Sequence, residues 1–208
     1  MRIIDVNQWN RKEHFEFFST FDEPFFGVTS EIDCTKAFNF CKQNGISFFA
    51  WYLHKSLKAA NTSANFKMRI VDGKPVVYDF VHASATIGRE DGTFGFSYVE
   101  YHALFEHFLK NLNAEIEAVQ KNPGLRLSTD PSQLNVIHYS SLPWTHITSV
   151  SHARNYKVSD SAPKIVFGKA HQVKHNMVMS VSVHGHHGLM DGLHVSQHFE
   201  LFQQYMND

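Results

Sequence analysis

The segment His186-His187-Gly188-Leu189-Met190-Asp191-Gly192 joins a strand-like run over 177–183 to a helical pattern over 191–206. A side chain in such a connection is held by rigid elements on both sides and can still face a channel. Three interpretations of these histidines are open from the motif alone. They are metal binding, a structural polar role, and general acid–base catalysis by one imidazole with Asp191 as a structural carboxylate.

The metal interpretation has the weakest support in the sequence. His184 and His186 are two residues apart and share one face of a strand, which suits a pair of zinc ligands. A dinuclear zinc hydrolase, however, needs an aspartate where Gly188 stands, and no acidic residue lies between His171 and Asp191. We therefore expect no metal at this motif.

The rest of the chain mixes strands and helices without the regular alternation of parallel α/β folds. The sequence therefore predicts an α+β fold with a mixed, largely antiparallel sheet packed with helices. Strands are expected at 2–6, 25–32, 66–70, 75–78, 81–87, 94–98, 135–139, 147–150, 165–167 and 177–183. Helices are expected at 11–18, 34–44, 48–60, 102–120 and 191–206. Asp72-Gly73, between two strand-like runs, predicts a hairpin turn.

Composition limits the class of protein. The 208 residues are 43% hydrophobic and 19% charged, with a formal charge of −1, so we expect one globular domain over 1–208 and neither a nucleic-acid partner nor a membrane partner. Cys34 and Cys41 have no zinc spacing and are expected to be reduced and structural. The N-terminus has no signal-peptide layout, and no apolar run reaches about 18 residues, which indicates a cytoplasmic protein.

The motif also has the spacing His-His-x-x-x-Asp-Gly, which is similar to the signature of CoA-dependent acyltransferases. Two distant segments, Trp9-Asn10-Arg11-Lys12-Glu13-His14-Phe15 and Ser140-Ser141-Leu142-Pro143-Trp144, resemble segments of the chloramphenicol acetyltransferase family. Further matches follow in order along essentially the whole chain: Phe66-Lys67-Met68-Arg69, Thr93-Phe94, Ala162-Pro163 and Gly168-Lys169. The resemblance implies the fold of that family and transfer of an acetyl group from acetyl-CoA to a hydroxyl, with chloramphenicol as the expected acceptor and antibiotic resistance as the role.

The resemblance also implies roles for individual residues. His187 would be the general base, and Asp191 would pair with Arg11 to set its position. Ser140 would donate to the tetrahedral oxyanion, with Ser141 as the alternative donor. Lys169 would lie near the phosphates of the coenzyme.

The acceptor side departs from the family pattern. Phe17, Phe26 and Phe94 keep aromatic character, whereas Phe18 stands where tyrosine is usual. Other expected pocket positions carry changed residues: Asp22 for leucine, Pro24 for cysteine, His138 for asparagine, His152 for leucine and Val166 for threonine. Trp144 is expected in the core or beside the channel, with the core favoured.

The family forms trimers, so the resemblance implies a homotrimer in which His187 and much of the acceptor pocket come from neighbouring subunits. Two other functions remain open. The chain could acetylate a different hydroxylated acceptor, or it could be a relative that sequesters a ligand without catalysis.

Overall fold

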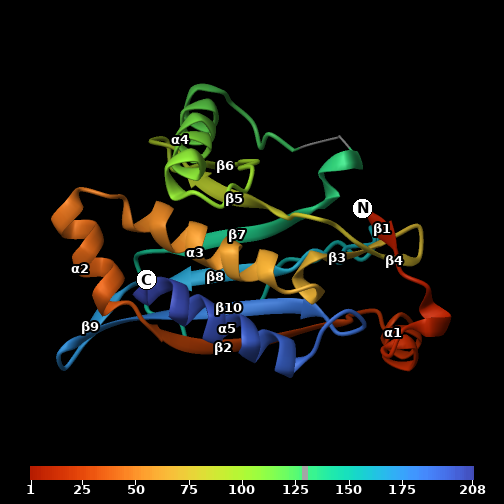
Figure 1. The fold of residues 1–208 in the computed structure, drawn as a ribbon. Coiled ribbons are helices and arrows are strands. Elements are labelled where there is room, and N and C mark those ends of the chain that lie inside the picture. Colours follow the sequence, from red (N-terminus) through yellow and green to blue (C-terminus); the bar gives the residue numbers. More distant parts are fainter. Residues whose placement is uncertain (128–130) are drawn as a thin grey trace.

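The computed structural model describes residues 1–127 and 131–208 (Figure 1). Its strands are β1 (Arg2–Ile3), β2 (Phe25–Asp33), β3 (Met68–Val71), β4 (Lys74–Val77), β5 (His82–Gly88), β6 (Phe94–Phe96), β7 (Val136–Leu142), β8 (Lys164–Gly168), β9 (His171–Val173) and β10 (Asn176–His186). Its α-helices are α1 (Lys12–Phe18), α2 (Thr35–Asn44), α3 (Phe48–Thr62), α4 (Phe105–Lys121) and α5 (Gly192–Asn207).

The main sheet has the order β2-β10-β8-β7-β5-β6, and β9 pairs with the start of β10. Strand β7 runs parallel to both β5 and β8, and the other pairs are antiparallel. A smaller antiparallel sheet has the order β1-β4-β3. The predicted mixed sheet of an α+β fold is confirmed.

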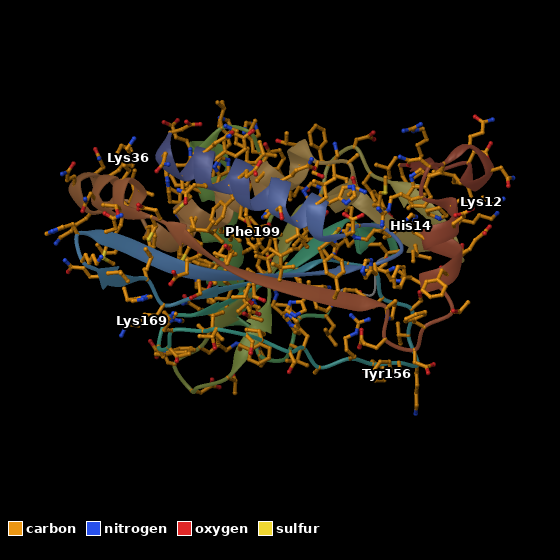
Figure 2. The ribbon with its side chains drawn as sticks, turned by 90° about the horizontal axis from the view of Figure 1, so that it is seen from below. Lys12, His14, Lys36, Tyr156, Lys169 and Phe199 are labelled. Carbon is orange, nitrogen blue, oxygen red and sulfur yellow. The ribbon has the colours of Figure 1, made fainter. Side chains whose placement is uncertain are left out.

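The main sheet has one apolar face and one polar face, and β10 shows the contrast. Met179, Val181 and Val183 are buried in the core that includes helices α3 and α5, while Ser180, Ser182 and His184 alternate with them and point to the other side. Figure 2 shows α5 on one side of β2 and β10, and the loop that carries Tyr156 on the opposite side.

We call this second side the polar face. Its residues follow from the register of the four strands. They include Phe25, Gly27, Thr29 and Glu31 on β2; Ser180, Ser182, His184 and His186 on β10; Lys164, Val166 and Gly168 on β8; and His138, Ser140 and Leu142 on β7.

Local sequence signals set several helix ends. Helix α2 ends at Gly45, whose φ of 65° is the left-handed conformation that glycine adopts without steric cost. Ser47 caps α3, since its side chain accepts a hydrogen bond from the backbone of Ala50. The predicted hairpin is present as β3 and β4, with Asp72 and Gly73 at positive φ in the turn.

The predicted strand at 147–150 is wrong. This segment follows β7, and both edges of β7 are already occupied by β5 and β8, so no free edge is available there for pairing. The chain instead runs irregularly through residues 145–160 over the polar face. Strand β9 was not predicted, because its three residues lack a clear apolar alternation.

No helix within the described residues is both long and apolar enough to cross a membrane.

Candidate active site

The His186–Gly192 motif turns the chain sharply from β10 into α5. Strand β10 ends at His186, whose carbonyl accepts hydrogen bonds from the backbone N–H groups of Leu189 (2.9 Å) and Met190 (3.1 Å). Gly185 permits this turn, because a Cβ at that position would lie 2.2 Å from the Met190 sulfur. The backbone N–H of His187 donates to the carbonyl of Pro24 (2.8 Å), which ties the motif to the start of β2.

Arg11 joins the two ends of the motif. Its Nη1 donates to Asp191 Oδ2 at 2.6 Å, and its Nη2 donates to the carbonyl of His187 at 3.1 Å. Asp191 also caps α5, because its side chain accepts a hydrogen bond from the backbone of Leu193. Burial raises the pKa of Asp191, but the Arg11 guanidinium and the His194 ring outweigh it and lower the pKa to about 2. The carboxylate is therefore charged across the physiological range.

The imidazole of His187 is held between aromatic rings. It stacks on Phe18 with a centroid distance of 4.0 Å and an interplanar angle of 3°, and Phe26 lies 4.6 Å away on a tilt. Its Nδ1 is buried and has no hydrogen-bond partner among the described residues. Phe17 is 60% exposed and contacts Phe18 edge-on at a centroid distance of 5.1 Å, without a ring contact to His187.

The neighbouring His186 has a different environment. It is 5% exposed, and its Nδ1 accepts a hydrogen bond from the backbone N–H of Gly188. Burial lowers its pKa to about 4, so the ring is neutral at pH 7. His186 therefore acts as a structural acceptor within the turn, whereas His187 has no such bond.

A cavity of about 950 Å³ opens on the polar face. Ser140 lines it, whereas Ser141 points to the other side of the sheet, where its hydroxyl accepts a hydrogen bond from Tyr52 (3.1 Å). The two serines that the sequence could not separate are thus assigned to opposite faces, and only Ser140 reaches the cavity.

Two histidines, His138 and His152, line the cavity. Burial lowers the pKa of His138 and of His152 to about 4, and the His184 ring, which packs 4.7 Å from His152, also has a lowered pKa. His152 Nε2 is buried and has no hydrogen-bond partner among the described residues. The rings of His138 and His152 are therefore neutral at pH 7 and can donate or accept hydrogen bonds without adding charge to the cavity.

An ion-pair network beside the cavity was not found from the sequence. Lys164 pairs with Asp160, and Arg154 lies 3.7 Å from the same carboxylate. The Arg154 guanidinium also lies 3.5 Å from the centroid of the Phe25 ring, a cation–π geometry. Asp160 and Lys164 are only four residues apart, but they lie in an irregular segment and at the start of a strand, so the spacing rule for helical ion pairs could not indicate them.

Several other residues that were predicted for the site lie outside the cavity. Trp144 is 80% exposed, so the expectation of core packing is wrong: the residue lies in the turn after β7, where the chain leaves the sheet. Lys169 is exposed, and its backbone N–H donates to Thr145. Phe94 does not line the cavity but contacts Phe96, which does. Val166 is buried between Ser140 and Ser182, and Asp22 is exposed.

His187 and Ser140 lie far apart within one chain. Ser140 pairs with Val166, which pairs with Ser182, and His187 follows Ser182 by five residues. Strand geometry puts them about 17 Å apart along the strands and about 10 Å apart across them. A single chain therefore does not bring the two groups to one substrate atom.

The cysteines and the motif histidines do not belong to the cluster of metal-ligating side chains found among the described residues. Cys34 and Cys41 are free and buried, and burial raises their pKa values to about 12 and about 11. Within residues 1–127 and 131–208, the single group of metal-ligating side chains close enough to share an ion is Glu31, His146 and His171.

Solved structures share this architecture. A chloramphenicol acetyltransferase structure matches with a TM-score of 0.92 and 30% identity, and the match covers 99% of this chain and 100% of that chain. A probable dihydrolipoamide acetyltransferase from Listeria monocytogenes shares the fold with a TM-score of 0.68 and 11% identity, over 98% of this chain and 92% of that chain.

Sequence comparisons agree with the structural match. A chloramphenicol acetyltransferase from Proteus mirabilis is 30% identical over 99% of this chain and 94% of the relative. The family model described as chloramphenicol acetyltransferase matches residues 1–203, which include Arg11, the β7 serines and the His186–Gly192 turn. The chain therefore belongs to the chloramphenicol acetyltransferase family.

Proposed function

We propose that the protein transfers the acetyl group of acetyl-CoA to a hydroxyl of chloramphenicol and so confers resistance to that antibiotic. The observation that carries the proposal is the placement of His187 at the end of β10. Its backbone is held by Arg11 and Pro24 and its ring by Phe18, in a chain that matches the family over nearly its full length.

His187 acts as the general base in this proposal. It takes the proton from the acceptor hydroxyl while that oxygen forms a bond to the thioester carbonyl carbon. The Ser140 hydroxyl donates a hydrogen bond to the resulting oxyanion. Collapse of the intermediate breaks the C–S bond, and the CoA thiolate leaves with the proton held by His187. Positioned bases contribute about 10²–10⁴ in rate, and an oxyanion donor about 10²–10³.

Self-association completes the site in this proposal. The separation of His187 from Ser140 requires a second chain, and a homotrimer lets His187 of one protomer meet Ser140, His138 and His152 of its neighbour. We also propose that residues 1–208 act as one domain in the cytoplasm.

The proposal is tested by incubating purified protein with acetyl-CoA and chloramphenicol and following the release of free thiol. The wild type should release one thiol per acetylated acceptor, and His187→Ala should reduce the rate by about 10²–10⁴. His175→Ala, which removes an exposed histidine from the β9–β10 turn, serves as the matched control. Absence of thiol release by folded wild-type protein would overturn the proposal.

A second acceptor class is favoured by the cavity lining. Several polar side chains line the cavity together with Ser140, among them His138, His152, Asp160 and Lys164. These groups would accommodate a hydroxylated acceptor that is more polar than chloramphenicol. A panel of alcohols in the same thiol assay separates the two acceptors.

A non-catalytic ligand-sequestering relative would bind chloramphenicol equally well before and after His187→Ala and would release no thiol with any acceptor. Equilibrium binding measured on both proteins distinguishes sequestration from catalysis.

A further inference from the structure

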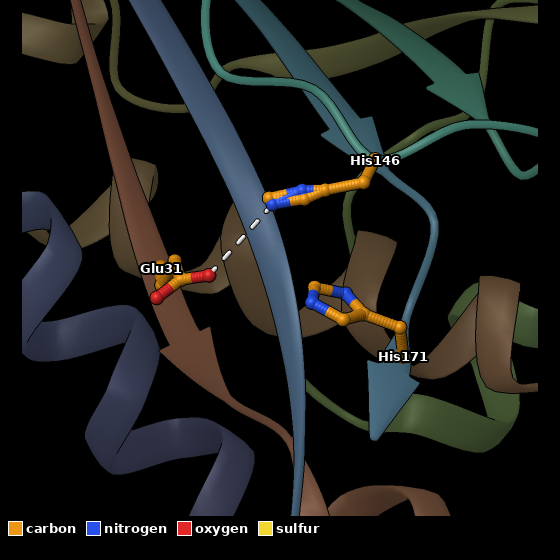
Figure 3. Close-up of side chains that lie close together, drawn as sticks. All are labelled: Glu31, His146 and His171. Atoms are coloured by element: carbon orange, nitrogen blue, oxygen red, sulfur yellow. Dashed lines mark ion pairs between the residues drawn. The ribbon is translucent and has the colours of Figure 1, made fainter. Parts of the chain in front are cut away.

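A second cluster of chemistry-bearing side chains lies away from the His186–Gly192 turn. Glu31 on β2, His146 in the segment after β7, and His171 at the start of β9 bring three ligand atoms to within 4.8 Å of one another (Figure 3). His146 Nε2 lies 3.9 Å from Glu31 Oε1, and the two imidazole rings have centroids 4.5 Å apart.

The main sheet fixes the position of Glu31 in this cluster. Glu31 is the cross-strand partner of Ser180, and both belong to the polar face. The Ser180 hydroxyl lies 3.4 Å from His146 Nε2, so the strand pair and the ring share one small region. The position of Glu31 is set by nine consecutive residue pairs between β2 and β10, not by a mobile loop.

The two histidine segments are also fastened to each other. The backbone N–H of Lys169 donates to the carbonyl of Thr145 (2.9 Å), directly before His146. Ile147 is buried against Gly168, where a Cβ would lie 2.9 Å from the isoleucine side chain. The backbones on either side of the cluster are therefore held before any ligand binds.

One ring contact favours a metal-binding tautomer. His171 Nδ1 lies 3.4 Å from the carbonyl oxygen of Lys169, a long contact that favours the proton on Nδ1. That tautomer leaves a lone pair on Nε2, and Figure 3 shows the outer end of the ring facing the same space as His146 and Glu31. A backbone carbonyl behind a ligating histidine is a common second contact in metal sites.

We propose that Glu31, His146 and His171 bind a zinc ion. Two imidazoles and one carboxylate form a ligand set that zinc accepts, with a fourth position open to water. Zinc bonds of about 2.0–2.2 Å put tetrahedral ligand atoms about 3.4 Å apart. Glu31 and His146 have side chains that are 59% and 38% exposed, so rotation about their side-chain bonds can close the present gaps.

Bound zinc would cross-link β2, the segment after β7 and β9. These three segments are far apart in the sequence. A zinc ion bound to all three would restrain the start of the irregular loop against the polar face. The site is separate from the acyl-transfer residues, and the proposal does not depend on that activity.

The test uses full-length protein without a histidine tag, freed of metal by a chelator. Zinc titration by calorimetry should show one ion per chain. His146→Ala and His171→Ala should each weaken binding by at least about tenfold, because even the loss of an outer-shell partner costs about 10–100-fold in metal affinity. Cobalt substitution should give the intense visible absorption of a four-coordinate site.

His107→Ala is the matched control. The His107 ring stacks on His102 at 4.4 Å, so this second histidine pair resembles the first in spacing but belongs to no three-ligand group among the described residues. Zinc affinity should be unchanged in this variant. Glu31→Gln provides a further test that keeps both rings and should weaken binding without disturbing the fold. Zinc binding that is absent from the wild type, or unaffected by all three cluster substitutions, would overturn the proposal.

Discussion

The two faces of the main sheet are built from the same strands but differ in their side chains and in the elements that cover them. The apolar face packs against helices, and Val181 on that face and Phe202 on helix α5 are both fully buried in one continuous core. The polar face carries serines and histidines and is covered by an irregular loop in place of helices. Stability therefore comes mainly from the first face, and the candidate chemistry lies on the second or at its end.

The largest difference between the faces should appear in stability. Phe202→Ala removes a fully buried ring from the apolar side and should lower the free energy of unfolding by about 3–5 kcal/mol. Ser182→Ala, equally buried on the polar side, removes the acceptor of the 3.1 Å hydrogen bond from Thr29 and a 3.5 Å contact with His184 Nδ1, and it should cost about 1–2 kcal/mol. Urea unfolding of both variants measures the contrast, and equal losses would show that the faces do not differ in this way.

Substitutions on the polar face should affect catalysis more than substitutions on the apolar face. Ser140→Ala on the polar face should lower kcat by about 10²–10³ through loss of the oxyanion donor. Ser141→Ala lies one residue away on the other face, where it removes the acceptor for Tyr52, and it should leave kcat nearly unchanged. Steady-state thiol release measures both variants. A larger loss of kcat for Ser141→Ala would reverse the assignment.

Arg11 tests whether the motif must be positioned at both of its ends. The substitution Arg11→Lys keeps a positive charge near Asp191 but removes the guanidinium fork that reaches the carbonyl of His187. We expect kcat to fall by roughly 10–100-fold with little change in KM, because small displacements of a catalytic group are costly.

Lys12→Ala, at the start of the neighbouring helix α1, is the control for this substitution. A purely structural role for Arg11 predicts reduced stability with an unchanged kcat, which steady-state kinetics on the folded fraction would reveal.

The smallest effect concerns a buried titratable ring on the apolar side. His198 is fully buried, and burial lowers its pKa to about 3, below the value of about 6.5 in the unfolded chain. The unfolded state therefore binds the extra proton, so the stability contributed by the neutral ring is complete above about pH 6.5 and is lost as the pH falls.

In the wild type, the free energy of unfolding should fall as the pH decreases from about 6 to about 4. His198→Asn should make this slope shallower by up to about 1.4 kcal/mol per pH unit. Denaturant unfolding at a series of pH values measures this slope, with His175→Asn as the exposed-site control. A slope identical to that of the wild type would show that His198 does not titrate as its burial indicates.

Local patterns predicted most of the elements. Gly45 and Ser47 mark the end of one helix and the start of the next because their effects on the backbone are local. The alternation along β10 separates the two faces for the same reason, since neighbouring side chains on a strand must point in opposite directions. Sequence similarity, not periodicity, indicated the partnership of Arg11 with Asp191, which are 180 residues apart.

The sequence by itself determined the α+β class, the helix ends, the hairpin and, by resemblance, the family. Only the tertiary structure decided which serine reaches the cavity, that Trp144 is exposed, and that His187 and Ser140 are separated within a chain. It also brought Glu31, His146 and His171 together from three segments. The physical reason is that side-chain patterns report on neighbours along the chain, whereas strand order and loop path determine which distant residues meet.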